Sequence, residues 1–365
     1  MRGIRTKKWY HFAIAGMLCG AGFHTYIAFR IIPALLAVFF VLLLIQHGTD
    51  IYKSIWKYLI IFVLCAGVTI APLLYTFHTH PEFLTARTGD VSVFAQKDTP
   101  LTQTLAHTVT QSLTKYHLSG DNNWRHNYPP YPIIEPIVGI WFLCGFLFSI
   151  GIFVSFAVRR FRHGNRNRKL LTHGLLIAWF FAFLAPEFMT TEGLPHCLRA
   201  IGTLPVVYIF AAYMINFVAE RMQKKSPLLS YGTTIFLCTM FVWIGFFNIT
   251  KYHVHWAHEH EQAAAFNKDL TDIARHIRTL PETETIYVVA GGLERLPIQL
   301  LTTDIPNIRY FYENEADMIP TDTPFLLFLP YYNDTVITTV TQKVPADIIE
   351  AHTDLGTSFF IIKSH

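Results

Sequence analysis

Glu192-Gly-Leu-Pro-His-Cys-Leu-Arg199 lies between two apolar segments, residues 170–188 and 199–218, each about as long as a membrane-spanning helix. This stretch brings a carboxylate, an imidazole and a guanidinium together at the mouth of a predicted span. Ionisable groups are costly to place at membrane depth, so they usually mark a ligand path or a binding site. The stretch therefore predicts a membrane protein whose ligand carries negative charge and resides at the membrane surface.

The composition of the whole chain agrees with a membrane location. Hydrophobic residues make up 52% of the 365 residues, aromatic residues 15% and charged residues only 15%, which is typical of an integral membrane protein. Seven stretches are apolar and about long enough to cross a bilayer as helices. They cover approximately residues 9–29, 31–46, 57–77, 133–158, 170–188, 199–218 and 231–249. We therefore expect a polytopic α-helical membrane protein with about seven spans.

Basic residues are concentrated at the N-terminus and in every second loop, which predicts that these parts face the cytoplasm. The alternate loops and the C-terminal tail are then extracytoplasmic, and the chain is expected in the plasma membrane. The net charge of +4 is explained by these loops and does not indicate nucleic-acid binding. Contact with lipid head groups is the expected role of the run at 159–169. The basic residues are Arg2, Arg5, Lys7, Lys8, Lys53, Lys57, Arg159, Arg160, Arg162, Arg166, Arg168, Lys169, Arg221, Lys224 and Lys225.

The predicted outer side carries two large segments. Residues 1–250 form a transmembrane region with an outer loop at 78–132, and residues 251–365 form a small extracytoplasmic α/β domain. In the outer loop we expect one helix, at 101–116. In the tail we expect a polar helix at 256–280, then strands at 285–290, 308–312, 325–329 and 358–362 that alternate with helices at 293–301 and 335–342.

One polar cluster lies where the first two predicted spans join, and a second follows the third span. Tyr26 and Arg30 are four residues apart, which would place both on one face of a helix end; anchoring at the membrane interface is the alternative explanation. Glu82 and Arg87 lie in a segment that starts at Pro81. A helix start with an exposed ion pair explains that second cluster equally simply, and such pairs contribute little stability.

Two further clusters precede the fourth and sixth predicted spans. Asp121, Trp124 and Arg125 combine an aromatic ring with charged groups, a mixture that suits sugar recognition, although an ordered polar turn is an equal alternative. In the opening stretch, Arg199 is suited to bidentate binding of a phosphate, with His196 as a second donor. A helix cap with an interfacial anchor is the alternative there. We favour a binding site because the charged groups are so dense.

The remaining patterns predict neither a metal nor a cofactor. His253-Val-His-Trp-Ala-His-Glu-His260 places imidazoles on one helix face, but no third ligand follows at a convincing spacing, so an interfacial helix is the better interpretation. Gly291-Gly292 lacks the third glycine of a dinucleotide fingerprint. The five cysteines show no paired spacing and are expected to be free thiols.

Four stretches together resemble a known family. They are Gly22-Phe-His-Thr-Tyr-Ile-Ala-Phe-Arg30, His80-Pro-Glu-Phe83 with Arg87, Gly120-Asp-Asn-Asn-Trp-Arg-His-Asn-Tyr-Pro129, and the opening stretch. In their order, and in their placement on the predicted outer face, they resemble the C-type membrane glycosyltransferases, in particular the bacterial protein-mannosyltransferase-like and aminoarabinose-transferase-like branch. The resemblance covers about residues 10–250, and the tail resembles the extracytoplasmic domain that often ends such proteins.

The resemblance implies an activity and a set of site residues. Such enzymes move a sugar from a polyprenyl-phosphate carrier to an acceptor outside the cytoplasm, so a polyprenyl-phosphate-linked sugar and membrane lipids are the expected partners. Preorganised donors would stabilise the charge of the leaving phosphate. The residues implied for the donor phosphate and lipid are Tyr26, Arg30, His196 and Arg199, and those for sugar or acceptor are Glu82, Arg87, Asp121, Trp124, Arg125 and Glu192.

One departure from the family concerns the general base. The family carries an acidic residue on a large first outer loop, whereas the first outer turn here is a few residues around Arg30 without Asp or Glu. A general base has to lie within hydrogen-bond reach of the acceptor. We therefore expect this chain to be the C-terminal part of a longer protein, or to work with a catalytic partner chain. By itself it is expected to be inactive, and its catalytic residues stay unassigned.

Two other functions remain open. A non-catalytic membrane subunit that binds a lipid-linked sugar would need the same outer cluster without a base. A transporter of lipid-linked precursors would need polar residues deep within the spans, and the ionisable groups here gather mainly at the outer ends instead.

Overall fold

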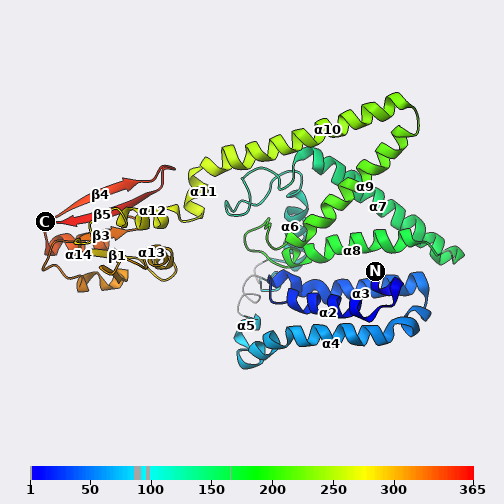
Figure 1. Cartoon of the computed structure of the whole chain (residues 1–365), viewed down its shortest axis with the longest axis horizontal. Helices are drawn as coiled ribbons and strands as arrows, with labels where there is room; N and C mark the ends of the chain where they lie inside the picture. Colours follow the sequence, from blue (N-terminus) through cyan, green and yellow to red (C-terminus); the bar gives the residue numbers. More distant parts are fainter. Residues whose placement is uncertain (1, 86–91, 96–98, 165) are drawn as a thin grey trace. The chain divides into compact units, whose positions relative to one another are not determined.

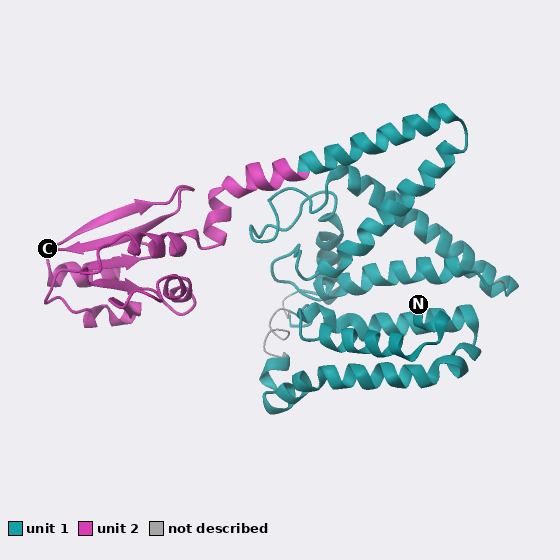
Figure 2. Ribbon diagram, in the orientation of Figure 1, with its two compact units in different colours: residues 1–247 teal, residues 248–365 magenta. Residues whose placement is uncertain are grey.

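The structure is a computed structural model that describes residues 2–85, 92–95, 99–164 and 166–365. The chain folds into two compact units, residues 1–247 and residues 248–365, shown in different colours in Figure 2. The first unit is helical and the second contains a small mixed sheet. Each unit has its own buried apolar core.

The first unit consists of helices joined mostly by short connections (Figure 1). Their bounds are α1 (Arg2–Thr6), α2 (Trp9–Gly22), η1 (Ile27–Ile31), α3 (Ile32–His47), α4 (Asp50–Thr79), α5 (Glu82–Thr85), α6 (Leu101–Thr114), α7 (Pro136–His163), α8 (Arg168–Phe188), η2 (Ile201–Thr203), α9 (Leu204–Gln223) and α10 (Pro227–Ile249), the last of which continues into the second unit.

By length and composition, six helices in the described ranges can cross a membrane. They are Ile27–His47, Asp50–Thr79, Pro136–His163, Arg168–Phe188, Ile201–Gln223 and Pro227–His258, so the membrane character expected from the sequence is supported. The expected span at 9–29 differs, because α2 has only 14 residues. At a rise of about 1.5 Å per residue it is shorter than a hydrocarbon core of about 30 Å. The backbone of Tyr26 is extended (φ −81°, ψ 143°), which separates α2 from η1.

Glycines allow two pairs of helices in the first unit to approach closely. A Cβ atom on Gly16 of α2 would lie 2.3 Å from the carbonyl oxygen of Phe62 in α4, and one on Gly20 would lie 1.9 Å from the hydroxyl of Thr69. Gly145 of α7 has the same role, since its Cβ would lie 2.0 Å from the carbonyl oxygen of Phe210 in α9. Small residues at these spacings are typical of helix contacts in membranes.

The opposite ends of the helices differ in chemistry. At one end, Arg160 of α7 donates from Nε to the carbonyl oxygen of Ile45 in α3 (2.6 Å), and the amide of Asn167 donates to Oε1 of Gln46 (3.3 Å). This end contains the basic run 159–169. The other end carries the loops around 115–135 and 189–200, which rest on an aromatic core that includes Tyr116, Phe142, Phe180 and Phe210. The orientation of these ends across a membrane stays a prediction.

The second unit begins at the end of α10 and is a small α/β domain. A π-helix (Thr250–His255) and η4 (Trp256–His258) lead into α11 (His260–Ala265) and α12 (Lys268–Ile277). The remaining elements are β1 (Ile286–Val289), α13 (Arg295–Leu301), β2 (Ile308–Phe311), η5 (Glu313–Met318), β3 (Leu326–Leu329), α14 (Asp334–Lys343), β4 (Ala346–His352) and β5 (Ser358–Ser364). The strands form one sheet in the order β2-β1-β3-β5-β4. β2, β1 and β3 pair in parallel, and β5 is antiparallel to both β3 and β4.

Two local expectations for the tail were wrong. The helix expected at 256–280 is interrupted, because Glu259 has an extended backbone and Asn267 adopts the left-handed conformation (φ 53°). Strand β4 was not expected. It lies at the edge of the sheet and pairs only with β5, and most of its residues are exposed, so it lacks the apolar alternation that marks a half-buried strand.

Candidate functional site

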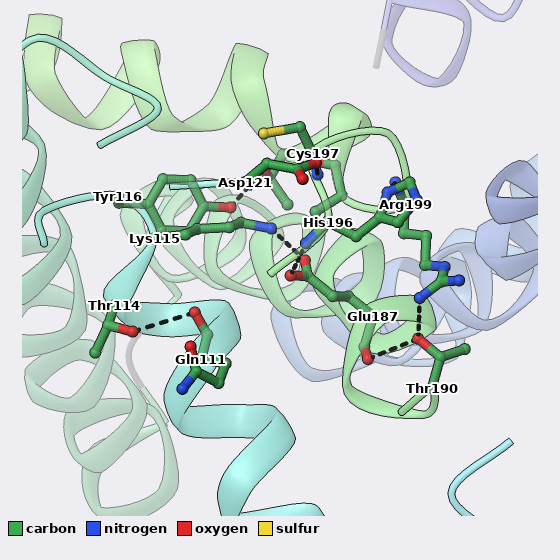
Figure 3. A network of polar contacts seen from close by, with 12 residues as sticks. Gln111, Thr114, Lys115, Tyr116, Asp121, Glu187, Thr190, His196, Cys197 and Arg199 are labelled. Atoms are coloured by element: carbon green, nitrogen blue, oxygen red, sulfur yellow. Dashed lines mark hydrogen bonds and ion pairs between the residues drawn. The ribbon is translucent and has the colours of Figure 1, made fainter. Parts of the chain in front are cut away.

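Several buried polar residues of the first unit gather where two loops meet (Figure 3). The first loop follows α6 and runs from Lys115 to Glu135, and the second joins α8 to η2 and runs from Met189 to Ala200. The two loops are joined directly: the amide of Cys197 donates to Oδ2 of Asp121 at 2.7 Å. We call this region the loop junction.

An ion pair between Lys115 and Glu187 lies below the loop junction. Both side chains have no exposed surface, and Nζ of Lys115 contacts Oε2 of Glu187. The other carboxylate oxygen, Oε1, accepts a hydrogen bond from the amide of His196 (2.9 Å). Glu187 is the penultimate residue of α8 and Lys115 follows α6, so the pair ties both helices to the second loop. Removing one member of such a pair leaves an uncompensated buried charge.

Tyr116 fixes the start of the first loop. Its ring packs against Phe142 and Phe180, and its hydroxyl pairs with Oγ1 of Thr203 in η2 at 2.7 Å. Burial raises the pKa of this phenol, so it stays protonated. Thr108 of α6 adds a bond from Oγ1 to the carbonyl oxygen of Phe188 (2.8 Å). These contacts fix α6 and the start of the first loop against α7, α8 and η2.

Asp121 is the hub of the loop junction and is 2% exposed. Its Oδ1 accepts from the amide of Asn123 (2.8 Å), and its Oδ2 pairs with Nδ1 of His126 (2.9 Å) in addition to the amide of Cys197. The preceding Gly120 is required by close packing, because a Cβ atom there would lie 2.4 Å from the carbonyl oxygen of Tyr131. The carboxylate is therefore held by groups of both loops.

Two neighbouring residues in the second loop have strongly shifted acidities. Burial, together with the positive charge of Arg199, lowers the pKa of His196 to about 4, so its imidazole is neutral at neutral pH. Burial and the nearby Asp121 carboxylate raise the pKa of Cys197 to about 12. A thiol with this pKa is a poor nucleophile at neutral pH, because the thiolate is the reactive form. Nucleophilic catalysis by Cys197 is therefore disfavoured.

Groups of the second loop hold the side chain of Arg199. Its Nη1 donates to Oγ1 of Thr190 (3.0 Å) and to the carbonyl oxygen of Glu192, and its Nη2 lies 3.6 Å from Oε2 of Glu192. The Arg199 side chain is 12% exposed, whereas that of Glu192 is 63% exposed. The guanidinium is thus positioned by groups of the second loop, while its carboxylate partner faces outward.

Tyr26 and Arg30 do not share a helix face, contrary to expectation. Tyr26 is the extended residue before η1, which contains Arg30. Arg30 stacks on the ring of Phe77 at the end of α4 (5.0 Å) and points Nη1 at the carbonyl oxygen of Leu84 (3.5 Å). These contacts are with α4 and α5, and they do not join Arg30 to the loop junction.

The other expected sugar or acceptor residues are placed as follows. Glu82 is exposed and pairs with Nδ1 of His80 (3.2 Å), while Arg87 lies outside the described residues. Trp124 packs against Tyr128, with ring centroids 5.5 Å apart. The amide of Arg125 donates to Oδ1 of Asn123 at 3.0 Å. Trp124 and Arg125 thus belong to the same loop as Asp121, and Glu82 belongs to the α4–α5 region.

The sequence reasoning missed the buried pair and His126. Glu187 had a usable signal, because it is an acidic residue inside a predicted apolar span and such residues usually have a partner. Lys115 had none, because it follows a polar helix and is expected at the surface. His126 lies in the stretch singled out around Asp121, but its pairing with that residue depends on how the loop folds.

Imidazoles and carboxylates gather in one place among the described residues. Asp121, His126 and His196 each offer one ligand atom, and these atoms all lie within 4.8 Å of one another. In the histidine-rich segment, by contrast, Nδ1 of His258 contacts the carbonyl oxygen of Val254 (2.8 Å) and Nδ1 of His260 contacts that of Leu355 (3.3 Å). That segment does not form a comparable group in the part of the chain described here.

No protein-family model matches the chain, and comparison with curated proteins and with solved structures finds no match.

Proposed function

We propose that this chain provides the donor-binding site of a membrane glycosyltransferase that takes a sugar from a polyprenyl-phosphate carrier on the extracytoplasmic side. The observation that carries the proposal is the position of Arg199, which is held by Thr190 and Glu192 beside a buried polar network at the ends of two candidate spans. A phosphate attached to a membrane-embedded lipid tail has to be bound at this level.

The contacts of Arg199 suit exchange of one anion for another. Its pair with Glu192 is long, at 3.6 Å, and the side chain of Glu192 is exposed, so the pair contributes little stability by itself. A phosphate offers more acceptor oxygens than a carboxylate and binds guanidinium in a bidentate manner. Thr190 keeps the guanidinium oriented while Glu192 is displaced. The donor phosphate would then take the place of the Glu192 carboxylate.

His196 supports the same role. Its Nδ1 faces the amide of Arg199 (3.4 Å), which leaves the other ring nitrogen to donate a hydrogen bond. Donors that are already in place where charge develops are the main means of stabilising a leaving phosphate. The links from His196 to Glu187, and from Cys197 to Asp121, hold this part of the loop rigid.

The acceptor and the general base are not assigned by this proposal. Asp121 already accepts three hydrogen bonds and is buried, and Glu192 faces Arg199. Glu82 is exposed in the α4–α5 region. Because each of these carboxylates already has a partner, a further part of a longer polypeptide or a catalytic partner chain would supply the base. A non-catalytic subunit that binds a lipid-linked sugar is favoured by the same observation.

The test is direct binding of a short polyprenyl phosphate. The full chain is purified in detergent and titrated with farnesyl phosphate, with farnesol as the ligand that lacks phosphate. We expect Arg199→Ala to weaken binding of farnesyl phosphate by at least about tenfold, since a charge-assisted contact is lost. Arg162→Ala, at the opposite basic end, is the matched control. Equal binding by Arg199→Ala and wild type, or equal binding of farnesol and farnesyl phosphate, would refute the proposal.

A further inference from the structure

Asp121, His126 and His196 bring one carboxylate and two imidazoles together from two different loops. One ligand atom of each lies within 4.8 Å of the other two. Nδ1 of His126 is 2.9 Å from Oδ2 of Asp121, and the ring centroids of His126 and His196 are 5.0 Å apart. In a tetrahedral site with bonds of about 2.0–2.1 Å, ligand atoms lie about 3.3 Å apart. Small side-chain movements would therefore bring all three atoms to bonding distance of one ion.

Surrounding hydrogen bonds already orient the carboxylate. Oδ1 of Asp121 accepts from the amide of Asn123, and Oδ2 accepts from the amide of Cys197, the residue next to His196. Nδ2 of Asn127 donates to the carbonyl oxygens of Asp121 (3.2 Å) and Tyr131 (2.8 Å). Such outer hydrogen bonds fix the orientation of metal ligands and are a regular part of metal sites.

The local charge balance also favours a cation. Among the described residues the only ion-pair partner of Asp121 is the imidazole of His126. Two cationic side chains of this region have carboxylates of their own, Lys115 with Glu187 and Arg199 with Glu192. A divalent ion would thus compensate the negative charge of the buried Asp121 carboxylate, since these two neighbouring cations already pair with other carboxylates.

The donor set selects the class of ion. Two imidazole nitrogens and one carboxylate oxygen suit zinc and related divalent first-row metals, whereas magnesium and calcium prefer oxygen ligands alone. We propose that Asp121, His126 and His196 bind a zinc-type divalent cation at the loop junction. Three protein ligands leave a fourth coordination position for water or an anionic oxygen. This site does not depend on the proposed glycosyl transfer, and an ion bound by His196 would take the place of the hydrogen bond from that imidazole to a phosphate.

The experiment measures zinc binding directly. The full chain is purified in detergent, freed of metal with a chelator, and titrated with Zn²⁺ in competition with a zinc-sensitive dye. A parallel titration with Co²⁺ records the visible absorption of the bound ion, which reports nitrogen and oxygen ligands in a site of low coordination number. We expect the wild-type chain to bind about one equivalent of Zn²⁺ at the loop junction. Each of His126→Ala and His196→Ala should weaken that equivalent by at least about tenfold.

Two controls separate this site from other histidines and from misfolding. His107→Ala removes an exposed imidazole on α6 and should leave binding unchanged. The double substitution His255→Ala with His258→Ala removes the histidine-rich segment of the second unit and should also leave this equivalent intact. Circular dichroism and thermal unfolding of the metal-free variants identify any that fail to fold, and His126→Asn then replaces His126→Ala. The proposal is overturned if wild type shows no tight equivalent, or if the equivalent survives in folded His126 and His196 variants but disappears with the double substitution.

Discussion

Glu187 at the end of α8 and Lys115 after α6 form an ion pair in which neither side chain has exposed surface. The two residues are 72 positions apart in the chain, and the pair joins two helix ends to the loop that carries His196. The free energy of a buried pair is a balance between desolvation and attraction. Its clearest effect here is to fix the position of that loop.

Single and double substitutions of this pair should behave differently. Lys115→Met and Glu187→Gln each leave one buried group without its partner, so each should lower the free energy of unfolding by about 3–5 kcal/mol. The double variant Lys115→Met with Glu187→Leu removes both charges and should recover much of that loss. Thermal unfolding of the three variants in the same detergent measures this. A double variant no more stable than the singles would show that the pair contributes net stability.

The helices were largely predictable from the sequence, but the end of the first predicted span was not. Apolar length identifies α3, α4, α7, α8, α9 and α10, because a spanning helix needs about 20 apolar residues. The stretch 9–29 satisfies the same criterion, yet the helix stops at Gly22. At this point Phe29 packs on Gly22, and its ring lies 2.2 Å from where a Cβ on Gly22 would be. A contact between residues that a turn brings together cannot be predicted from the hydropathy of the sequence.

The candidate site was predictable in part. The stretches around Asp121 and around Arg199 both lie at the loop junction. The signal was a mixture of aromatic, amide and charged side chains for the first and the density of charged groups for the second. Their direct contact through Cys197 and Asp121 was not foreseeable, because it joins residues 76 positions apart. Lys115 was missed for a related reason: a lysine is expected to be exposed, and only the tertiary position of Glu187 explains its burial.

Gly120→Ala should destabilise the first loop. The added Cβ would lie 2.4 Å from the carbonyl oxygen of Tyr131 and 2.5 Å from Nδ2 of Asn127, so the backbone has to move. We expect a loss of about 1–3 kcal/mol, as for other overpacked sites. Thermal unfolding of the variant measures it. Gly232→Ala in α10 is the control, since a Cβ there meets nothing within 4 Å and alanine favours helix. Equal stability of Gly120→Ala and wild type would argue against the tight loop.

The stability of the second unit should depend on pH through the ion pair of Arg278 and Asp304. Both guanidinium Nη atoms donate to the carboxylate, at 2.7 and 2.9 Å, and this contact lowers the pKa of Asp304. Because the pKa is lower in the folded state, the contribution is present above the ordinary value of 3.8 and is lost as pH falls through the folded pKa. Asp304→Asn should therefore be less stable than wild type at pH 7, and the difference should disappear in acid.

Hydrogen exchange of α12, compared between the two proteins at each pH, measures this difference. Asp322→Asn, whose exposed carboxylate forms no ion pair among the described residues, serves as the control. A difference between Asp304→Asn and wild type that persists unchanged at low pH would mean that the lost stability comes from packing rather than from charge.

Cys197 should react slowly with thiol reagents as long as the loop junction is folded. Burial and the Asp121 carboxylate raise the pKa of the thiol to about 12, so little thiolate exists at pH 8. The test uses a variant in which the other cysteines, Cys19, Cys65, Cys144 and Cys238, are replaced by serine, and follows alkylation by iodoacetamide. A matched variant that also carries Cys197→Ser and Asn122→Cys places a thiol on an exposed position of the first loop.

Because the alkylation rate follows the thiolate fraction, we expect Cys197 to react more than about a hundredfold slower than this control in the native state. In denaturant the two rates should become equal, since the burial that raises the pKa is lost. Comparable native rates would show that the amide contact between Cys197 and Asp121 opens readily. The second loop would then not be rigid, and the fixed positions of His196 and Arg199 would be refuted.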